Sequence, residues 1–196
     1  MEQKRKIILA SASPRRKELL EKIGLKFQVA PSDFPENLGQ DLPPEGIVKY
    51  ISIGKASAVA VKYPDAVIIA ADTIGVLKDR VIGKPHNAEE ACEILKSLSG
   101  KTHRVITGLT VIDTASGRML TRTIETKVRF KKLSDMEIQS YVKSGEPLDK
   151  AGAYAIQGMG ALIVEEIKGD YYNVVGMPLN ALADLLKEFG IGILGL

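Results

Sequence analysis

The stretch that decides the fold is Ile7-Ile8-Leu9-Ala10-Ser11-Ala12-Ser13-Pro14-Arg15-Arg16-Lys17-Glu18-Leu19-Leu20. Its apolar start predicts a short buried strand, and the small polar residues 11–13 predict a turn. Pro14 suits the first position of a helix, where its missing N–H costs nothing. Ser13 suits the cap before it, because its hydroxyl can accept from a backbone N–H one turn into the helix. The stretch therefore predicts a strand, a turn and a helix in succession.

The first turn of this helix carries an unusual charge pattern. Arg15, Arg16 and Lys17 place three cations at the positive end of the helix dipole, and each costs about 0.3–1 kcal/mol when exposed. A bound anion would reverse that cost, because free N–H groups, the hydroxyls of Ser11 and Ser13, and two guanidinium groups suit a phosphate. The alternative is that the arginines are solvated or paired with acids elsewhere in the chain.

The rest of the chain alternates strands and helices. We expect a loop over residues 31–44 and a helix over 44–62. A strand of continuous apolar residues follows at 66–71, with Asp72 and Thr73 at its C-terminal end, and residues 74–77 are expected to continue as strand. A long hairpin is predicted from residues 103–113 and 119–131, and further helices are predicted over 88–98, from Ser134 to residue 143, and over 179–189. We expect a strand over residues 161–167 before the last helix. The sequence therefore indicates a mixed α/β fold in one domain of 196 residues.

Composition narrows the classes of function. The net charge is only +3, with basic and acidic residues well mixed, so we expect no nucleic-acid polymer as partner. The single cysteine excludes an internal disulfide and a cysteine-rich zinc site. His86 and His103 are isolated, and we expect them to be surface or capping residues. No apolar run is long enough for a secretory signal or a membrane span, so we expect no membrane partner and a cytoplasmic location.

Several residues are candidates for chemistry, each with a structural alternative. Asp72 ends an apolar strand, where a carboxylate can hold a metal or polarise water, or can simply cap its own turn. Lys84, between Gly83 and Pro85, suits a phosphate, although most surface lysines have no specific role. The small neighbours of Lys55 allow close approach of a ligand or of another helix.

The segment 145–158 is charged at its start and small at its centre. Gln157 carries an amide that both donates and accepts hydrogen bonds, as recognition of a base edge requires. Glu146 and Asp149 are candidates for holding a metal or supporting its ligands. Each of the three could equally be an ordinary turn residue.

Taken together, the motifs resemble the Maf family of nucleoside triphosphate pyrophosphatases. The matching stretches are residues 9–16, 71–73, 83–85, 99–105, 149–154 with 157–158, and 172–179. They occur in family order and span nearly the whole chain. The resemblance implies an elongated mixed sheet with flanking helices, similar to the inosine-triphosphate pyrophosphatases, in a single domain of residues 1–196 with two lobes around a central cleft.

The resemblance also implies roles for individual residues. Asp72 matches the catalytic proton acceptor, and Arg15, Thr73 and Gln157 match positions tied to substrate choice. The cleft positions Ser11, Arg16, Lys55 and Lys84 are expected to bind phosphate, and Asp72 with Glu36 to hold Mg²⁺ or Mn²⁺. The residues around Gln157 resemble the branch that hydrolyses dTTP, UTP and their modified forms, and the family suggests a homodimer.

The implied reaction converts a nucleoside triphosphate and water to the monophosphate and pyrophosphate. We expect a house-cleaning role that keeps modified nucleotides out of nucleic acids, with a link to arrest of cell division. Two alternatives stay open at this point: a nucleotide-binding regulator of septum formation without turnover, and a pyrophosphatase for purine nucleotides or 7-methyl-GTP.

Overall fold

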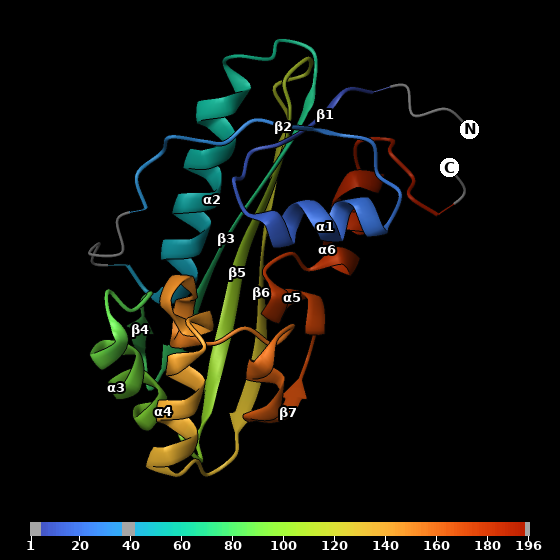
Figure 1. The fold of residues 1–196 in the computed structure, drawn as a ribbon. Helices are drawn as coiled ribbons and strands as arrows, with labels where there is room; N and C mark the ends of the chain where they lie inside the picture. Colours follow the sequence, from blue (N-terminus) through green and yellow to red (C-terminus); the bar gives the residue numbers. More distant parts are fainter. Residues whose placement is uncertain (1–4, 37–41, 195–196) are drawn as a thin grey trace. The chain divides into compact units, whose positions relative to one another are not determined.

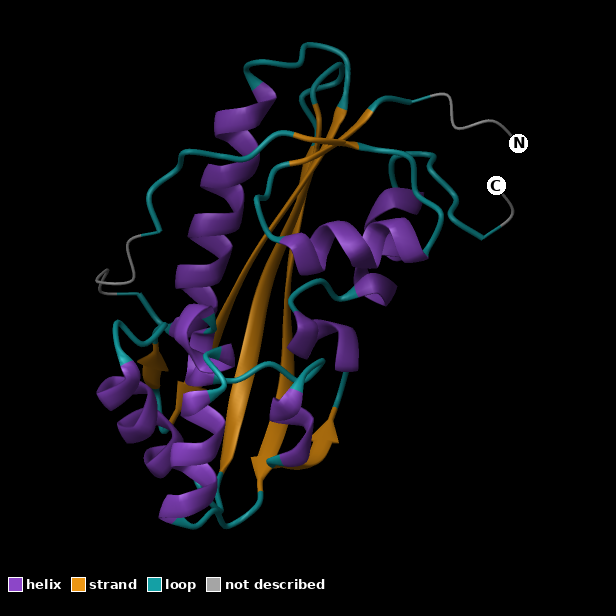
Figure 2. Ribbon diagram, in the orientation of Figure 1, coloured by secondary structure: helices purple, strands orange, loops and turns teal. Residues whose placement is uncertain are grey.

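The computed structural model describes residues 5–36 and 42–194, and it consists of helices packed on a mixed β-sheet (Figures 1 and 2). The described strands are β1 (Ile7–Leu9), β2 (Gln28–Val29), β3 (Val67–Leu77), β4 (Arg80–Ile82), β5 (Thr102–Asp113), β6 (Met119–Phe130) and β7 (Val164–Lys168). Their order in the sheet is β2-β1-β3-β5-β6-β7, and β4 pairs with β3. Strand β1 is parallel to β2 and β3, whereas the pairs β3–β4 and β6–β7 are antiparallel. The predicted mixed α/β class is confirmed.

The described α-helices are α1 (Pro14–Lys22), α2 (Pro44–Ala60), α3 (Ala88–Leu98), α4 (Asp135–Lys143), α5 (Tyr171–Val175) and α6 (Leu179–Lys187). Short 3₁₀ turns are η1 (Glu146–Asp149), η2 (Ala151–Ala153) and η3 (Met159–Leu162). Within residues 5–36 and 42–194, every helix is too short or too polar to cross a membrane.

The chain divides into two compact units. Unit 1 comprises Met1–Asp72, Thr107–Ile124 and Gly176–Leu196, and unit 2 comprises Thr73–Ile106 and Glu125–Val175. Strands β3, β5 and β6 contribute residues to both. The expectation of one domain with two lobes around a cleft stays a prediction.

In unit 1, helix α2 packs closely against the sheet. A Cβ atom at Gly108 of β5 would overlap the backbone carbonyl of Val48, so only glycine lets the helix approach this far. The Ser52 and Thr110 hydroxyls share a hydrogen bond of 2.9 Å beside this contact. On β3, Ile68 and Ala70 belong to the apolar cluster that includes the α2 residues Ala56 and Val59. Because strand side chains alternate with period two, Asp72 faces α2 as well.

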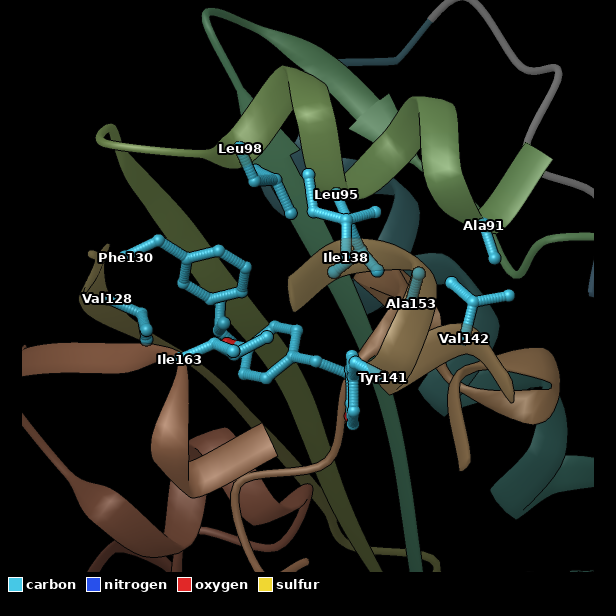
Figure 3. Packing of buried hydrophobic residues seen from close by; sticks show 12 residues of the cluster. Ala91, Leu95, Leu98, Val128, Phe130, Ile138, Tyr141, Val142, Ala153 and Ile163 are labelled. Carbon is cyan, nitrogen blue, oxygen red and sulfur yellow. The ribbon is translucent and has the colours of Figure 1, made fainter. Parts of the chain in front are cut away.

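In unit 2, the core lies between helices α3 and α4 and strand β6. Figure 3 shows Leu95 and Leu98 from α3, Ile138 from α4, and Val128 and Phe130 from β6 in one cluster. These side chains are all at most 2% exposed, so unit 2 has its own hydrophobic core.

Local capping follows the predictions closely. Ser134 and Glu137 form the predicted capping box of α4, and the Asn87 side chain caps α3. Gly24 ends the first helix with a φ of +73°, a backbone conformation that glycine adopts without strain. The predicted strand over residues 161–167 is displaced: residues 161 and 162 belong to η3, and β7 begins at Val164. Helix α5 was not predicted, because five residues are too few to establish a helical period.

Candidate active site

The turn before α1 has the predicted geometry. Ser13 is the N-cap, its hydroxyl accepts from the backbone N–H of Arg16 at 3.5 Å, and Pro14 is the first helical residue. The Ser11 hydroxyl accepts from the backbone N–H of Ser13 at 3.2 Å. No acidic residue lies in the first turn of the helix. The cationic first turn expected from the sequence is therefore present in unit 1, and its binding of an anion stays a prediction.

Arg16 turns its guanidinium toward this turn. Its Nε donates to the carbonyl of Gly176 at 2.9 Å, and its Nη1 donates to the Ser11 hydroxyl at 3.2 Å. Burial lowers the pKa of Arg16, whereas the carboxylates of Asp72 and Glu36 act in the opposite direction. An arginine stays charged even so. Arg16 therefore brings a cation into the same electrostatic environment as two acids of unit 1, and its half-buried neighbour Arg15 adds a second positive charge.

Lys55 joins those two acids directly. Its ammonium donates to Oδ1 of Asp72 at 2.7 Å and to Oε1 of Glu36 at 2.6 Å. Lys55 and Asp72 are each only 6% exposed, whereas the Glu36 side chain is 51% exposed. A buried carboxylate needs such a partner, because an unpaired buried charge is strongly destabilising. The structure therefore brings Lys55, Asp72 and Glu36 together in one ion cluster. The charges of its two carboxylates also act on the Arg16 guanidinium.

The position of Glu36 depends on a contact that the sequence did not reveal. A Cβ atom at Gly54 in α2 would overlap the ring of Phe34, so this aromatic ring lies flat against the helix backbone. The ring also packs edge-on against Tyr50, with the centroids 5.5 Å apart. Glu36 follows two residues later and meets Lys55, the neighbour of Gly54. The small residue Gly54 thus makes room for an aromatic ring from the loop before α2, and a glycine inside a helix was the only signal for this contact.

Asp72 and Glu36 fit a divalent cation in charge and in kind of ligand. One carboxylate oxygen of each residue contacts the Lys55 ammonium, so the two oxygens converge on one positively charged group. Among the described residues, no group of three or more histidine, cysteine, aspartate or glutamate side chains could hold a metal without further ligands. Mg²⁺ in nucleotide sites is commonly held by one or two carboxylates together with substrate phosphates and water. Two convergent carboxylates therefore satisfy the part of such a site that a protein supplies.

The other predicted site residues belong to unit 2. Lys84 is exposed just after the β3–β4 hairpin, and Gln157 is exposed between η2 and η3. The carbonyl of Gly83 accepts from the N–H of Gly152 at 3.1 Å, so the loop of Lys84 lies against the turn that precedes Gln157. Thr73 is half-buried next to Asp72 in β3, and strand alternation directs its side chain to the opposite face of that strand. The roles of all three stay predictions.

Glu146 is engaged inside unit 2. Its two carboxylate oxygens accept from the hydroxyl of Tyr141 and from the backbone N–H groups of Met159 and Gly160, at 2.7–2.9 Å. These donors favour a structural role over the metal-holding role considered from the sequence. Asn173 is also structural, because its Nδ2 donates to the Val105 carbonyl and to the Thr126 hydroxyl, both at 3.0 Å.

The expectation that His103 lies at the surface or at a cap is wrong. The residue is only 1% exposed, its Nε2 lies 3.0 Å from the hydroxyl of Tyr154, and its ring packs edge-on against Phe130 and Tyr154. Burial lowers the pKa of His103 to about 4, so the ring is neutral at pH 7. The error arose because one isolated histidine has no periodic pattern that reveals its burial.

Solved structures confirm the fold at low sequence identity. A HAM1 protein from Coxiella burnetii superposes with a TM-score of 0.52 at 16% identity, over 93% of this chain and 98% of that chain. The Ham1 protein of Staphylococcus aureus gives a TM-score of 0.51, also at 16% identity, over 94% and 99% of the two chains. These likenesses support a common fold of helices around a mixed sheet.

Relatives found by sequence are much more similar to this chain than these two solved structures are. A protein of Desulforamulus reducens called dTTP/UTP pyrophosphatase is 48% identical over 189 residues, which cover 96% of this chain and 99% of the relative. A protein of the same name from Methanococcoides burtonii is 49% identical over 190 residues, with coverage of 96% and 97%. Residues 6–189 match the family described as Maf-like protein. The motifs occur in order along the sequence, and the family match covers almost the whole length of the chain. The chain therefore belongs to the Maf family.

Proposed function

We propose that this protein hydrolyses dTTP and UTP, and their modified forms, to the nucleoside monophosphate and pyrophosphate. The observation that carries the chemistry is Asp72, a buried carboxylate held by Lys55 within the field of Arg16. A site that only bound phosphate would gain nothing from a second buried anion beside its ligand. The pyrimidine substrates are supported by the names of two relatives that are 48% and 49% identical over nearly the full chain.

The proposed phosphate contacts start at α1. Arg16 presents a guanidinium already oriented by Ser11 and by the carbonyl of Gly176, so little side-chain entropy is lost when a phosphate binds. Lys84 supplies a further cation, and Lys55 contributes through its ammonium. The charge that develops on the leaving pyrophosphate is stabilised by such cations, and this electrostatic effect is the main source of catalysis in phosphoryl transfer.

Asp72 is the proposed acceptor of the proton from the attacking water. Lys55 contacts its Oδ1, so we assign the proton to Oδ2. Asp72 and Glu36 would also hold a Mg²⁺ or Mn²⁺ ion, which when bound neutralises phosphate charge. Gln157 is proposed to recognise the uracil or thymine edge through paired hydrogen bonds, and Arg15 and Thr73 to contribute to substrate choice. A polar contact of this kind discriminates strongly, because the wrong base leaves buried polar groups unpaired.

The biological role that we propose is removal of modified pyrimidine nucleotides from the cytoplasmic pool before polymerases use them. A homodimer is suggested by the family resemblance, and light scattering of the purified protein tests it.

A nucleotide panel with Mg²⁺ tests the proposed reaction, with pyrophosphate and orthophosphate measured separately. We expect pyrophosphate from dTTP and UTP, and a fall in turnover of about 100-fold or more for Asp72→Asn. Asp113→Asn is the matched control, because Asp113 is also buried in unit 1 but binds Arg5 and Ser116. Absence of turnover with every nucleotide would favour a regulator without catalysis, and preference for purine or 7-methylated guanine nucleotides would favour the other branch. Near-normal turnover of Asp72→Asn would remove Asp72 from the mechanism.

A further inference from the structure

The turn that carries Gln157 is held from one side by a phenol and a carboxylate. Residues 154–158 connect η2 to η3, and the N–H of Gly158 donates to the carbonyl of Ala155 at 3.1 Å within this turn. The Gln157 side chain is exposed. The backbone on either side of Gln157 is anchored by further hydrogen bonds.

Tyr141 and Glu146 provide that anchoring. The Tyr141 hydroxyl accepts from the N–H of Ala155 at 3.1 Å and donates to Oε1 of Glu146 at 2.7 Å. Glu146 in turn accepts from the N–H of Met159 through Oε2 and from the N–H of Gly160 through Oε1, both at 2.9 Å. Three backbone N–H groups on either side of Gln157 thus donate to the Tyr141 hydroxyl or to the Glu146 carboxylate.

The turn lies directly on this pair, with no space between them. A Cβ atom at Gly158 would overlap the Glu146 carboxylate, and one at Gly160 would come within 2.8 Å of the Tyr141 hydroxyl. Glycine at both positions is therefore required by the close approach. At Gly160 a Cβ atom would also overlap the carbonyl of Ala155, so the turn is folded closely on itself as well.

At neutral pH the pair consists of a protonated phenol and a charged carboxylate. Tyr141 is 4% exposed and belongs to the core cluster of unit 2 in Figure 3. Burial, followed by the bond to Glu146, raises the pKa of Tyr141, so its hydroxyl stays a donor. Partial burial acts to raise the pKa of Glu146, but the hydrogen bonds from Tyr141, Gly160 and Met159 outweigh it and hold the pKa below its usual value. A charged acceptor makes each of these hydrogen bonds stronger than a neutral one.

We propose that Tyr141 and Glu146 are positioning residues that fix the Gln157 amide for recognition of the pyrimidine base. This inference rests on the proposed function, because it takes Gln157 as the residue that recognises the base. The pair touches no substrate atom; it acts by holding the backbone of residues 155–160. Such support determines whether a recognition group keeps the geometry that its hydrogen bonds need.

The first test measures kcat and KM for UTP and CTP in Tyr141→Phe and Glu146→Gln. Both changes keep the size of the side chain, so the core is preserved. We expect the UTP-to-CTP ratio of kcat/KM to fall about tenfold, since loss of one hydrogen bond to a charged group changes an equilibrium by about this factor or more. The larger part of the change should lie in KM for UTP.

Matched controls separate positioning from general loosening of unit 2. Tyr154→Phe removes a buried hydroxyl of the same core cluster that bonds His103 instead of the turn. Glu137→Gln alters a glutamate that accepts from the Ser134 backbone and hydroxyl in the capping box of α4. We expect both controls to keep the wild-type UTP-to-CTP ratio.

The Glu146→Gln substitution, made in the Gln157→Ala protein, tests whether its effect depends on Gln157. In Gln157→Ala, the additional change Glu146→Gln should leave the UTP-to-CTP ratio unaltered, because no amide remains to be positioned. Equal effects of Glu146→Gln in both backgrounds would overturn the inference. Hydrogen exchange gives a readout independent of turnover: the amides of Met159 and Gly160 should exchange about tenfold faster or more in Glu146→Gln.

The outcomes distinguish this inference from the proposed function. A wild-type enzyme without preference for UTP over CTP, or an unchanged preference in Gln157→Ala, refutes base recognition by Gln157 and this inference with it. A preference that Gln157→Ala abolishes but Tyr141→Phe and Glu146→Gln both retain refutes the inference alone. Unchanged exchange at residues 159 and 160 in Glu146→Gln refutes the anchoring itself.

Discussion

The substitution Gly54→Ala should impair catalysis while leaving the protein folded. The new methyl group would lie under 3.0 Å from three atoms of the Phe34 ring, whereas ordinary contact is 3.4–4 Å. The ring must therefore retreat by about 1 Å to reach a favourable separation. Since Glu36 lies two residues after Phe34, the same displacement moves its carboxylate away from the Lys55 ammonium, now 2.6 Å distant.

Two opposing contributions keep the effect of this change on stability small. Alanine improves on glycine inside a helix by about 1 kcal/mol. Overpacking against the ring costs about 1–3 kcal/mol. We expect a net loss in the free energy of unfolding of about 0–2 kcal/mol, measured by urea denaturation. The variant should therefore be folded under assay conditions.

Turnover should fall much more than stability. A displacement of about 1 Å in a catalytic group commonly costs about 100-fold in rate, and we expect a loss of about 10- to 100-fold in kcat/KM for UTP with Mg²⁺. Gly46→Ala is the matched control, because it lies in the same helix and its Cβ would meet Leu42 and Pro43 only at 3.4 Å or more. Adding Phe34→Leu to Gly54→Ala should restore part of the activity by making room for the methyl group. Equal turnover in Gly54→Ala and Gly46→Ala would refute the reasoning.

Three further predictions follow from buried charges and rings. Lys55→Met removes the ammonium that bonds both Asp72 and Glu36. We expect a loss of about 3–5 kcal/mol in the free energy of unfolding, measured by urea denaturation at pH 7.5, and recovery of most of it when Asp72→Asn is added. A loss below about 1 kcal/mol would contradict the paired arrangement. Burial lowers the pKa of His103 from 6.5 to about 4, so as pH falls the imidazole of the unfolded chain is protonated before that of the folded protein. The wild type should therefore lose about 2 kcal/mol of unfolding free energy from this group between pH 7.5 and 5, and His103→Gln should lack that loss. Equal pH dependence of stability in both proteins would exclude a contribution from His103. Arg16→Lys cannot keep the bonds of both Nε and Nη1, so KM for UTP should rise about tenfold, and an unchanged KM in steady-state assays would argue against a phosphate contact at Arg16.

Local chemistry is what the sequence determined well. The Ser13 cap, Pro14 at the first helical position and the stop at Gly24 depend only on residues within one or two turns. The capping box of α4 was predictable for the same reason. Because these features need no knowledge of distant segments, most helix boundaries and the α/β class followed from residue order. The motifs likewise indicated Arg16, at the start of α1, and Asp72. The expectation that Asp72 lies at the C-terminal end of a strand is wrong, because β3 continues through it to Leu77.

Tertiary structure decided which of those residues meet. Lys55 lies 17 residues from Asp72 and 19 from Glu36, and only the packing of α2 on the sheet brings the three charges together. The burial of His103 depends on rings from distant parts of the chain in the same way. The contacts of Glu146 illustrate the reason most clearly: a glutamate before a proline could equally face water or a metal, and the fold alone directs it toward Tyr141 and the turn of Gln157. Sequence patterns specify which face of an element is apolar, but partners across the fold depend on how those faces pack.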